Sequence, residues 1–197
     1  MSNKAPSGFQ YTRPRAIIRS HWADGKWHDI EVLEDDHLPL SLAATALHYG
    51  QSAFEGLKAF QQPDQSICLF RPLENAKRLR QSCERLCMPL VTDELFMEGL
   101  SRAIKENQSL IPDHQSGGSL YVRPFVFGSG PTIGVRPSDT YEFIVIVIPV
   151  GNYYSNESGE GAKSIISESF DRAAPLGMGN VKAAGNYASD LLPTKLA

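Results

Sequence analysis

The feature that most constrains the fold is a pair of apolar segments, SLYVRPFVFG at 119–128 and YEFIVIVIPV at 141–150. Both are rich in β-branched and aromatic residues, which favour strands. The second segment is apolar at nearly every position rather than at alternate ones, so both of its faces must be covered by other parts of the chain. We therefore expect two central strands of one sheet.

Two turn signals earlier in the chain predict antiparallel hairpins. Asp24 and Gly25 separate one pair of strand-like runs, and Pro63 and Asp64 separate another. The strands expected on either side of these turns are residues 15–20 with 26–33, and residues 53–60 with 65–70.

Two amphipathic helices are expected between these hairpins and the apolar segments. Apolar residues recur at helical spacing over residues 73–86, and Pro89 ends that run. Thr92 is the expected N-cap of the second helix, with Asp93 and Glu94 in its first turn. Strands and helices mix without strict alternation, which favours an α+β fold over a doubly wound sheet.

The composition along the chain predicts one complete domain and the beginning of a second. Residues 1–13 are expected to form a flexible arm, and residues 14–149 a small α+β domain. A linker rich in glycine, serine and asparagine is expected at 150–161, and the start of a second domain at 162–197, with one strand at 162–169. This last part is too short to bury its own core, so we expect that further chain or a partner completes it.

Composition and charge exclude several classes of function. The chain has 197 residues, 42% of them apolar, and a net charge of -3 with scattered basic residues, which disfavours nucleic acid as a partner. Cys68, Cys83 and Cys87 suit neither a disulfide framework nor a zinc site, so we expect reduced core thiols and no metal. No segment suits a signal peptide or a membrane span, which predicts a cytoplasmic protein. The motifs of nucleotide-binding loops, zinc proteases and serine hydrolases are also missing.

One lysine, Lys182, lies among small residues in GNVKAAGNYASDLL at 179–192. The small neighbours would leave room for a cofactor against the backbone, and a lysine buried there would be a candidate for a Schiff base. The alternative is an exposed lysine in a loop, which the local composition by itself favours. Tyr187, five residues later, could hydrogen-bond a ring oxygen or simply cap a short helix.

Two interpretations remain open for each of the next features, which involve four residues. Tyr121 and Arg123 lie two apart on a strand and so share a face, where Arg123 needs either a substrate carboxylate or a structural Asp or Glu. Phe54 marks either close packing or an apolar pocket. Arg78 lies on the polar side of its helix, where solvent exposure and a phosphate partner are the alternatives.

Five motifs together resemble the branched-chain amino acid aminotransferases, which are fold-type IV enzymes that depend on pyridoxal 5'-phosphate. The motifs occur in the order of the family, and the match as a whole extends over nearly the whole chain: LHYGQSAFEGLKAF, SLYVRPF, GPTIGVRP, IPVGNYY and VKAAGNYASDLL. The resemblance implies a two-domain fold-type IV enzyme that transfers the amino group of Leu, Ile or Val to 2-oxoglutarate. The products would be branched 2-oxo acids and L-glutamate.

The resemblance also implies a role for each matching residue. Lys182 would form the Schiff base with the cofactor and move the proton, Tyr187 would bind the phenolic oxygen, and Arg78 would bind the phosphate. Tyr121 and Arg123 would line the substrate site, where the arginine accepts the side-chain carboxylate of glutamate or 2-oxoglutarate. The remaining matches are to the walls of the apolar pocket, Phe54 and Tyr153, and to residues contributed across a homodimer interface, Tyr49, Ile133 and Val135.

The family's chain continues well beyond the point that matches Ala197. It includes the acid that binds the pyridine nitrogen, the turns that hold the phosphate and the turn that binds the α-carboxylate. We therefore expect the 197-residue chain by itself to be an inactive, truncated aminotransferase. The alternatives are another fold-type IV enzyme, namely a D-amino acid aminotransferase or an aminodeoxychorismate lyase, or a non-catalytic half-chain that binds a partner or acts as a scaffold.

Overall fold

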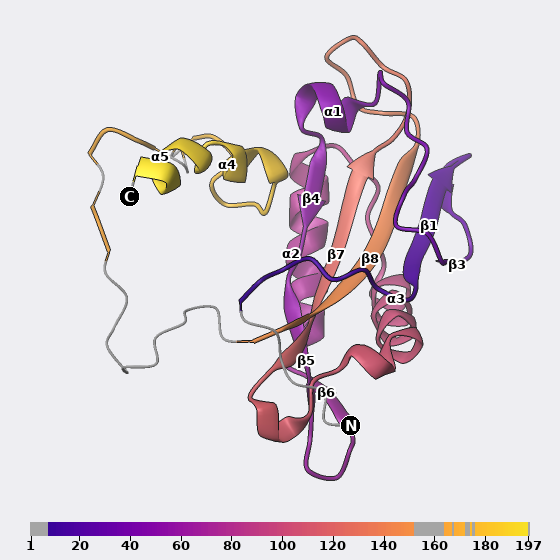
Figure 1. Ribbon diagram of the computed structural model, residues 1–197. Coiled ribbons are helices and arrows are strands. Elements are labelled where there is room, and N and C mark those ends of the chain that lie inside the picture. Colours follow the sequence, from indigo (N-terminus) through magenta and orange to yellow (C-terminus); the bar gives the residue numbers. More distant parts are fainter. Residues whose placement is uncertain (1–7, 152–163, 167, 172–173, 175, 197) are drawn as a thin grey trace.

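The two apolar segments form the longest strands, β7 (Ser119–Gly128) and β8 (Tyr141–Val150), which pair antiparallel over their full length. The computed structural model describes residues 8–151, 164–166, 168–171, 174 and 176–196 (Figure 1). The other strands are β1 (Ile17–Ala23), β2 (Lys26–Trp27), β3 (Glu31–Leu33), β4 (Ser52–Phe54), β5 (Leu57–Gln61) and β6 (Ile67–Leu69). The helices are α1 (Thr45–Tyr49), α2 (Pro72–Arg85), α3 (Asp93–Glu106), α4 (Ala184–Ala188) and α5 (Leu191–Leu196), with 3-10 turns at Gln108–Leu110 and His114–Ser116.

All strands of the described chain belong to one antiparallel sheet. Its order is β2-β1-β8-β7-β5-β6, with β3 paired to β1 and β4 paired to β7. Both expected hairpins form, and Asp24 and Gly25 have the positive φ values of a tight hairpin turn. The central position of β7 and β8 and the α+β fold class are thus confirmed.

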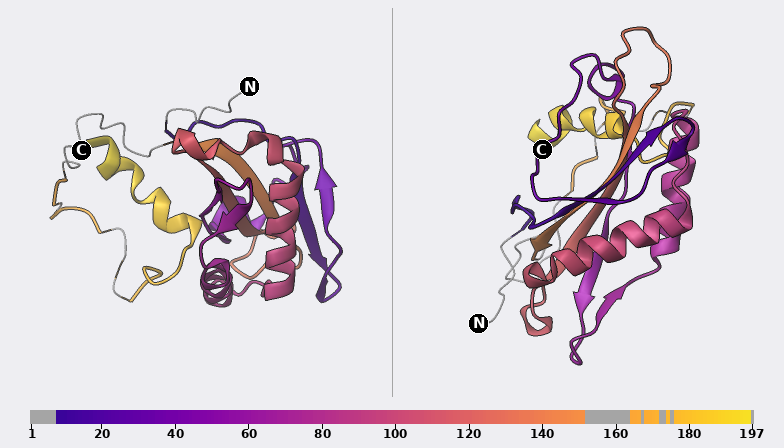
Figure 2. Two further views of the ribbon diagram at one scale, coloured as in Figure 1. Left: turned by 90° about the horizontal axis from the view of Figure 1, so that it is seen from below. Right: turned by 90° about the vertical axis from the view of Figure 1, so that its right-hand side faces the viewer.

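The sheet has one face covered by helices and one face left open to other groups. Along β7, burial alternates: Val122 and Val126 are fully buried, while Tyr121 and Arg123 are only partly covered. Figure 2 shows α2 and α3 against one face of the sheet. The largest fully buried side chains form the core between these layers, among them Leu79, Phe96, Leu100, Leu120, Phe143, Val145 and Val147.

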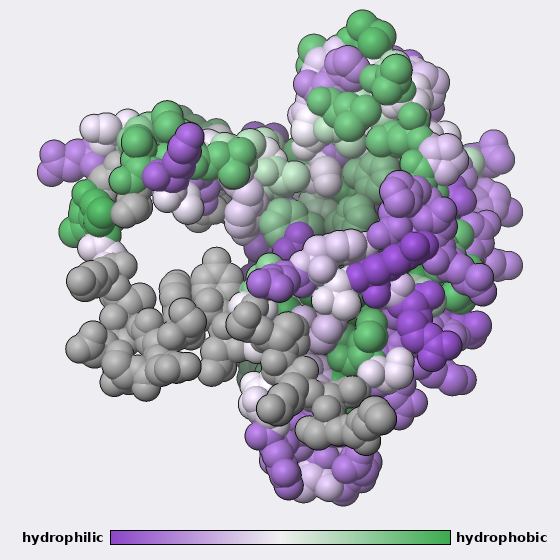
Figure 3. Space-filling view, viewed as in Figure 1, coloured by the Kyte–Doolittle hydropathy of each residue, from purple (hydrophilic) through white to green (hydrophobic). Residues whose placement is uncertain are grey.

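The opposite face carries a groove of about 460 Å³ over β7 and β8. Figure 3 shows apolar side chains gathered on this side of the molecule. The groove is lined mainly by Phe125, Phe127, Ile144 and Ile146 from the sheet, with Leu33 at its edge. One face of β7 and β8 is therefore closed by the core, and the other face is accessible.

The two long helices begin and end close to the expected residues, for local reasons. Pro72 stands at the first position of α2, where a missing N–H costs nothing, and the chain after Arg85 turns at Cys87 with a positive φ. The Thr92 hydroxyl accepts the Leu95 N–H at 3.2 Å and caps α3 as expected. One position of the expected apolar stripe is wrong, because Leu73 is 52% exposed at the first turn of α2, beyond the edge of the core.

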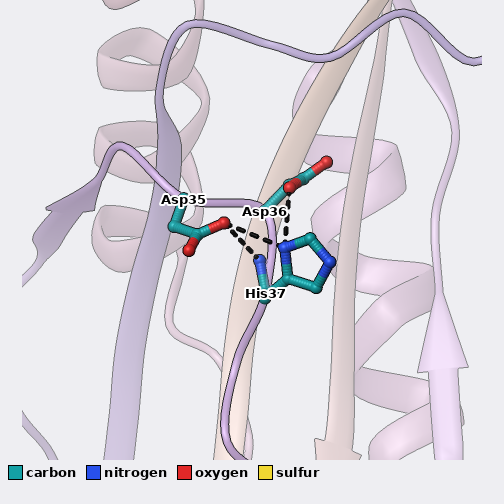
Figure 4. A group of neighbouring side chains, drawn as sticks. All are labelled: Asp35, Asp36 and His37. Carbon is teal, nitrogen blue, oxygen red and sulfur yellow. Dashed lines mark hydrogen bonds and ion pairs between the residues drawn. The ribbon is translucent and has the colours of Figure 1, made fainter.

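Residues near the N-terminus contact the loop that follows β3. The Tyr11 hydroxyl donates to an oxygen of Asp36 at 2.5 Å, and Arg13 lies within ion-pair distance of Asp35 and Asp36. In that loop, His37 Nδ1 is 2.9 Å from Asp35 and 3.0 Å from Asp36 (Figure 4). These bonds raise the pKa of His37 and lower the pKa of Asp35, since the hydrogen bond between them favours the charged pair.

The segment after the apolar strands differs from expectation where it is described. The described residues of the strand expected at 162–169 are irregular, Ile165 and Ile166 are exposed, and no described strand pairs with them. Most of the predicted linker, residues 152–161, lies outside the described residues. No helix in the described part of the chain is both long and apolar enough to cross a membrane.

The expectation of core thiols is correct for only one cysteine. Cys83 is fully buried on α2, whereas Cys68 and Cys87 are exposed, and all are free thiols. Cys68 lies on the short strand β6 and Cys87 lies just after α2, and neither residue belongs to the core. Burial raises the pKa of the Cys83 thiol to about 12.

These environments predict unequal cysteine reactivity. With iodoacetamide at pH 8, we expect Cys68 and Cys87 to be alkylated in the native protein and Cys83 to react at least about tenfold more slowly, since the thiolate is the nucleophile. Peptide mass spectrometry over time measures each rate. In urea all three should react alike, and equal rates in the native protein would contradict the burial of Cys83.

Candidate functional site

The backbone of Lys182 is held on both sides by elements far away in the sequence. Its N–H donates to the Ser82 hydroxyl of α2 at 2.9 Å, and its carbonyl accepts the Phe54 N–H of β4 at 3.1 Å. A β-bridge between Ala53 and Ala183 continues this pairing. Lys182 is therefore aligned with the edge of the sheet rather than lying in a free loop.

The side chain of Lys182 points into a group of aromatic rings. Its Nζ lies 2.5 Å from the Tyr187 hydroxyl and 4.5 Å from the centre of the Phe54 ring. The Phe54 and Tyr187 rings are 4.8 Å apart. Lys182 is half-buried in this group, so the exposed lysine that local composition favoured is wrong. Tyr187 lies near the end of α4 rather than at its start.

Tyr121 and Arg123 share a face of β7 and meet, as expected. The Tyr121 hydroxyl accepts hydrogen bonds from Nε and one terminal nitrogen of Arg123, at 3.0 and 2.8 Å. The Arg123 guanidinium also lies 4.5 Å from the centre of the Phe54 ring, which joins it to the Lys182 group. No carboxylate among the described residues lies within ion-pair distance of Arg123.

Arg78 is exposed, with 51% of its side-chain surface accessible, but its guanidinium is paired with a carboxylate next to Phe54. Its Nε and one terminal nitrogen bind the two oxygens of Glu55, at 2.5 and 2.7 Å. Glu55 is fully buried and also accepts the Asn75 side-chain amide at 2.8 Å. Hydrogen bonding to Glu55 raises the pKa of Arg78, although partial burial acts in the opposite direction.

Glu55 and Ser82 are site residues that the sequence did not indicate. A carboxylate directly after Phe54, within a stretch of otherwise apolar and small residues, was the available signal for Glu55. For Ser82 the signal was a hydroxyl on the buried side of α2, next to Cys83. Neither signal identifies a partner, because the partners are separated by 23 and 100 residues in the chain.

Comparison with known proteins supplies the family. A "Branched-chain-amino-acid aminotransferase" of Helicobacter pylori is 46% identical over 190 residues, 96% of this chain and 56% of the relative. One of Haemophilus influenzae is 44% identical over 190 residues, 96% of this chain and 55% of the relative. The chain belongs to the branched-chain-amino-acid aminotransferase family. No family model matches the chain.

Solved structures agree with this assignment. A T.th. branched-chain amino acid aminotransferase with pyridoxamine 5'-phosphate matches with a TM-score of 0.69 and 26% identity, over 90% of this chain and 55% of that one. The Escherichia coli enzyme matches with a TM-score of 0.62 and 25% identity, over 91% and 54%. The fold is therefore that of the fold-type IV aminotransferases. The chain spans about half the length of the curated relatives it matches.

The other residues expected in an aminotransferase site form a separate group. The Tyr49 hydroxyl donates to the Ile133 carbonyl, at the end of the molecule that carries α1 (Figure 1). Val135 and Tyr49 line a second hollow of about 260 Å³. All three side chains are exposed, Val135 by 91%. The interactions described above join Lys182 to Tyr187, Phe54 and Arg123 but not to this group. Tyr153 lies outside the described residues.

Gly56 allows the Tyr121 hydroxyl to reach Arg123. A Cβ atom at residue 56 would lie 2.2 Å from the Tyr121 oxygen and 2.9 Å from the ring carbon that carries it. Such contacts are closer than any side chain tolerates, so the ring would have to move. The glycine thus fixes where the Tyr121 and Arg123 pair can lie.

Gly56→Ala should destabilise the protein by about 1–3 kcal/mol through this overlap. Urea unfolding followed by circular dichroism measures the change. Gly134→Ala is the matched control, since a Cβ there meets nothing within 4 Å, and it should change stability by less than about 0.5 kcal/mol. Equal stability of the two variants would contradict the close approach of Tyr121.

Proposed function

We propose that this chain forms part of an enzyme that transfers the amino group of branched-chain L-amino acids to 2-oxoglutarate through Lys182. The observation that carries the proposal is the position of the Lys182 amine, against the Tyr187 hydroxyl and the Phe54 ring, with Arg123 beside the same ring. The names of the relatives support the same reaction.

The residues present fit pyridoxal 5'-phosphate. The T.th. enzyme was solved with pyridoxamine 5'-phosphate, the aminated form of this cofactor. Here, Lys182 offers a primary amine for an aldehyde, and Tyr187 offers a phenol for a ring oxygen. Glu55 occupies two of the five N–H groups of Arg78, so the other three can bind phosphate. When bound, this cofactor supplies an aldehyde carbon and a ring that accepts electrons.

The chemical roles follow from the environment of each side chain. Lys182 Nζ would remove the proton from the α-carbon of the substrate as a general base and would then donate it, as a general acid, to the carbon that the cofactor's aldehyde supplies. The Tyr187 hydroxyl would orient the amine through their hydrogen bond. Phe54 would exclude water next to the amine and contact an aliphatic substrate side chain.

Arg123 would explain how one site accepts both Leu and glutamate. Its charge has no carboxylate partner within the described chain, and the Tyr121 hydroxyl holds the guanidinium without neutralising it. A dicarboxylate can therefore place its second carboxylate on Arg123, while an aliphatic substrate contacts Phe54.

A homodimer in the cytoplasm would complete this proposal. Tyr49, Ile133 and Val135 are exposed, which suits residues that reach the site of a second subunit. Exposed free thiols at Cys68 and Cys87 suit a reducing compartment.

The first test is the identity of the reactive lysine. When the 197-residue chain is mixed with pyridoxal 5'-phosphate and reduced with borohydride, the adduct should form mainly on Lys182. Peptide mass spectrometry locates it. Lys182→Arg should remove that adduct, whereas the control Lys58→Arg, on β5, should leave it unchanged. An adduct spread evenly over all lysines would contradict the proposal and favour the scaffold alternative.

The second test is substrate choice. It uses a chimaeric protein in which this chain is joined to the part of the Helicobacter pylori relative that the match does not cover. Transamination should proceed with L-leucine and not with D-alanine, with 2-oxoglutarate as acceptor. Arg123→Met should raise KM for 2-oxoglutarate by about tenfold or more, because a carboxylate loses its charged partner, and should change KM for L-leucine by less than about threefold. A preference for D-alanine would favour the other fold-type IV enzymes.

A further inference from the structure

The hydroxyl of Ser82 connects two residues of the proposed active site. It lies on α2, fully buried, and donates to the Arg78 carbonyl one helical turn earlier at 3.0 Å. The same oxygen accepts the Lys182 N–H at 2.9 Å. One side chain thus joins the turn of α2 that carries Arg78 to the segment that carries Lys182.

The geometry gives the hydroxyl a fixed orientation. A serine hydroxyl has one hydrogen to donate and two lone pairs to accept. Since the hydrogen is used within the helix, the lone pairs face outward, towards the Lys182 N–H. A serine within a helix is less favourable than alanine there, so helix stability alone gives no reason for a serine at this position.

We infer that Ser82 is a positioning residue for Lys182. The bond from Ser82 fixes the Lys182 N–H and the bond from Phe54 fixes its carbonyl, so the direction in which the side chain leaves the backbone is set from both sides. This direction brings Nζ to the Tyr187 hydroxyl. The inference rests on the proposed function, because it takes Lys182 as the reactive amine and Arg78 as the residue that binds the cofactor's phosphate. Ser82 would set the spacing between these two residues.

The test compares Ser82→Ala with Ser82→Thr and with Ser20→Ala. Threonine keeps a hydroxyl that can bond the carbonyl four residues earlier in a helix. Ser20, on β1, is also fully buried, and its hydroxyl donates to the His28 carbonyl at 2.6 Å, so Ser20→Ala removes a serine hydrogen bond from another part of the fold. The probe is pyridoxal 5'-phosphate with borohydride reduction, and the readout is the rate of adduct formation on Lys182 relative to that on Lys58 and Lys77.

Ser82→Ala should lower this relative rate by about fivefold, Ser82→Thr should restore most of it, and Ser20→Ala should leave it unchanged. Hydrogen exchange of the Lys182 amide provides a readout without cofactor, and it should become faster only in Ser82→Ala. Unchanged exchange and labelling in Ser82→Ala would overturn the inference while the proposed function stands. Faster exchange in a protein whose Lys182 is never labelled would support the positioning role and overturn the proposed function.

Discussion

The ten-residue pairing of β7 with β8 determines where the site can form. Because side chains alternate along a strand, the register that directs Val122 and Val126 to the helices also directs Tyr121 and Arg123 to the opposite face. A shift of one residue would bury Arg123 in the core and expose the valines, so the hydrophobic core fixes the functional face as well. Stability and site geometry therefore depend on the same hydrogen-bonded ladder.

The short strand β4 transmits this geometry to the reactive lysine. It pairs with β7 through Ala53 and Val126, and on its other side it receives the Lys182 segment. The last residue of the strand and the residue after it have separate tasks, since Phe54 contacts the Lys182 amine and the Arg123 guanidinium, and Glu55 binds Arg78. This three-residue strand thus connects the sheet to the Lys182 segment, and the residue that follows it connects the sheet to Arg78.

Features set by local sequence could be predicted, and features set by distant contacts could not. The apolar run at 141–150, the Thr92 cap and the shared face of Tyr121 and Arg123 follow from neighbouring residues. The bonds from Glu55 to Arg78 and from Ser82 to Lys182 join distant segments, so no local pattern reveals them. Local composition misjudged Lys182 for the same reason, and only the order of motifs along the whole chain corrected it. The strand expected at 162–169 failed because a strand also needs a neighbour.

The two arginines of the site bind anions in different ways. Glu55 neutralises Arg78, so this arginine offers directed N–H groups with little net charge, and an anion there is selected by geometry. Tyr121 holds Arg123 with a neutral hydroxyl, so the charge remains and attracts a carboxylate more strongly. In the proposed reaction the cofactor stays bound while the substrates exchange. Arg78, fixed and neutralised by Glu55, suits a cofactor that stays in place. Arg123, charged and beside an apolar ring, suits substrates that exchange, because it can bind a dicarboxylate while Phe54 stays accessible to an aliphatic side chain.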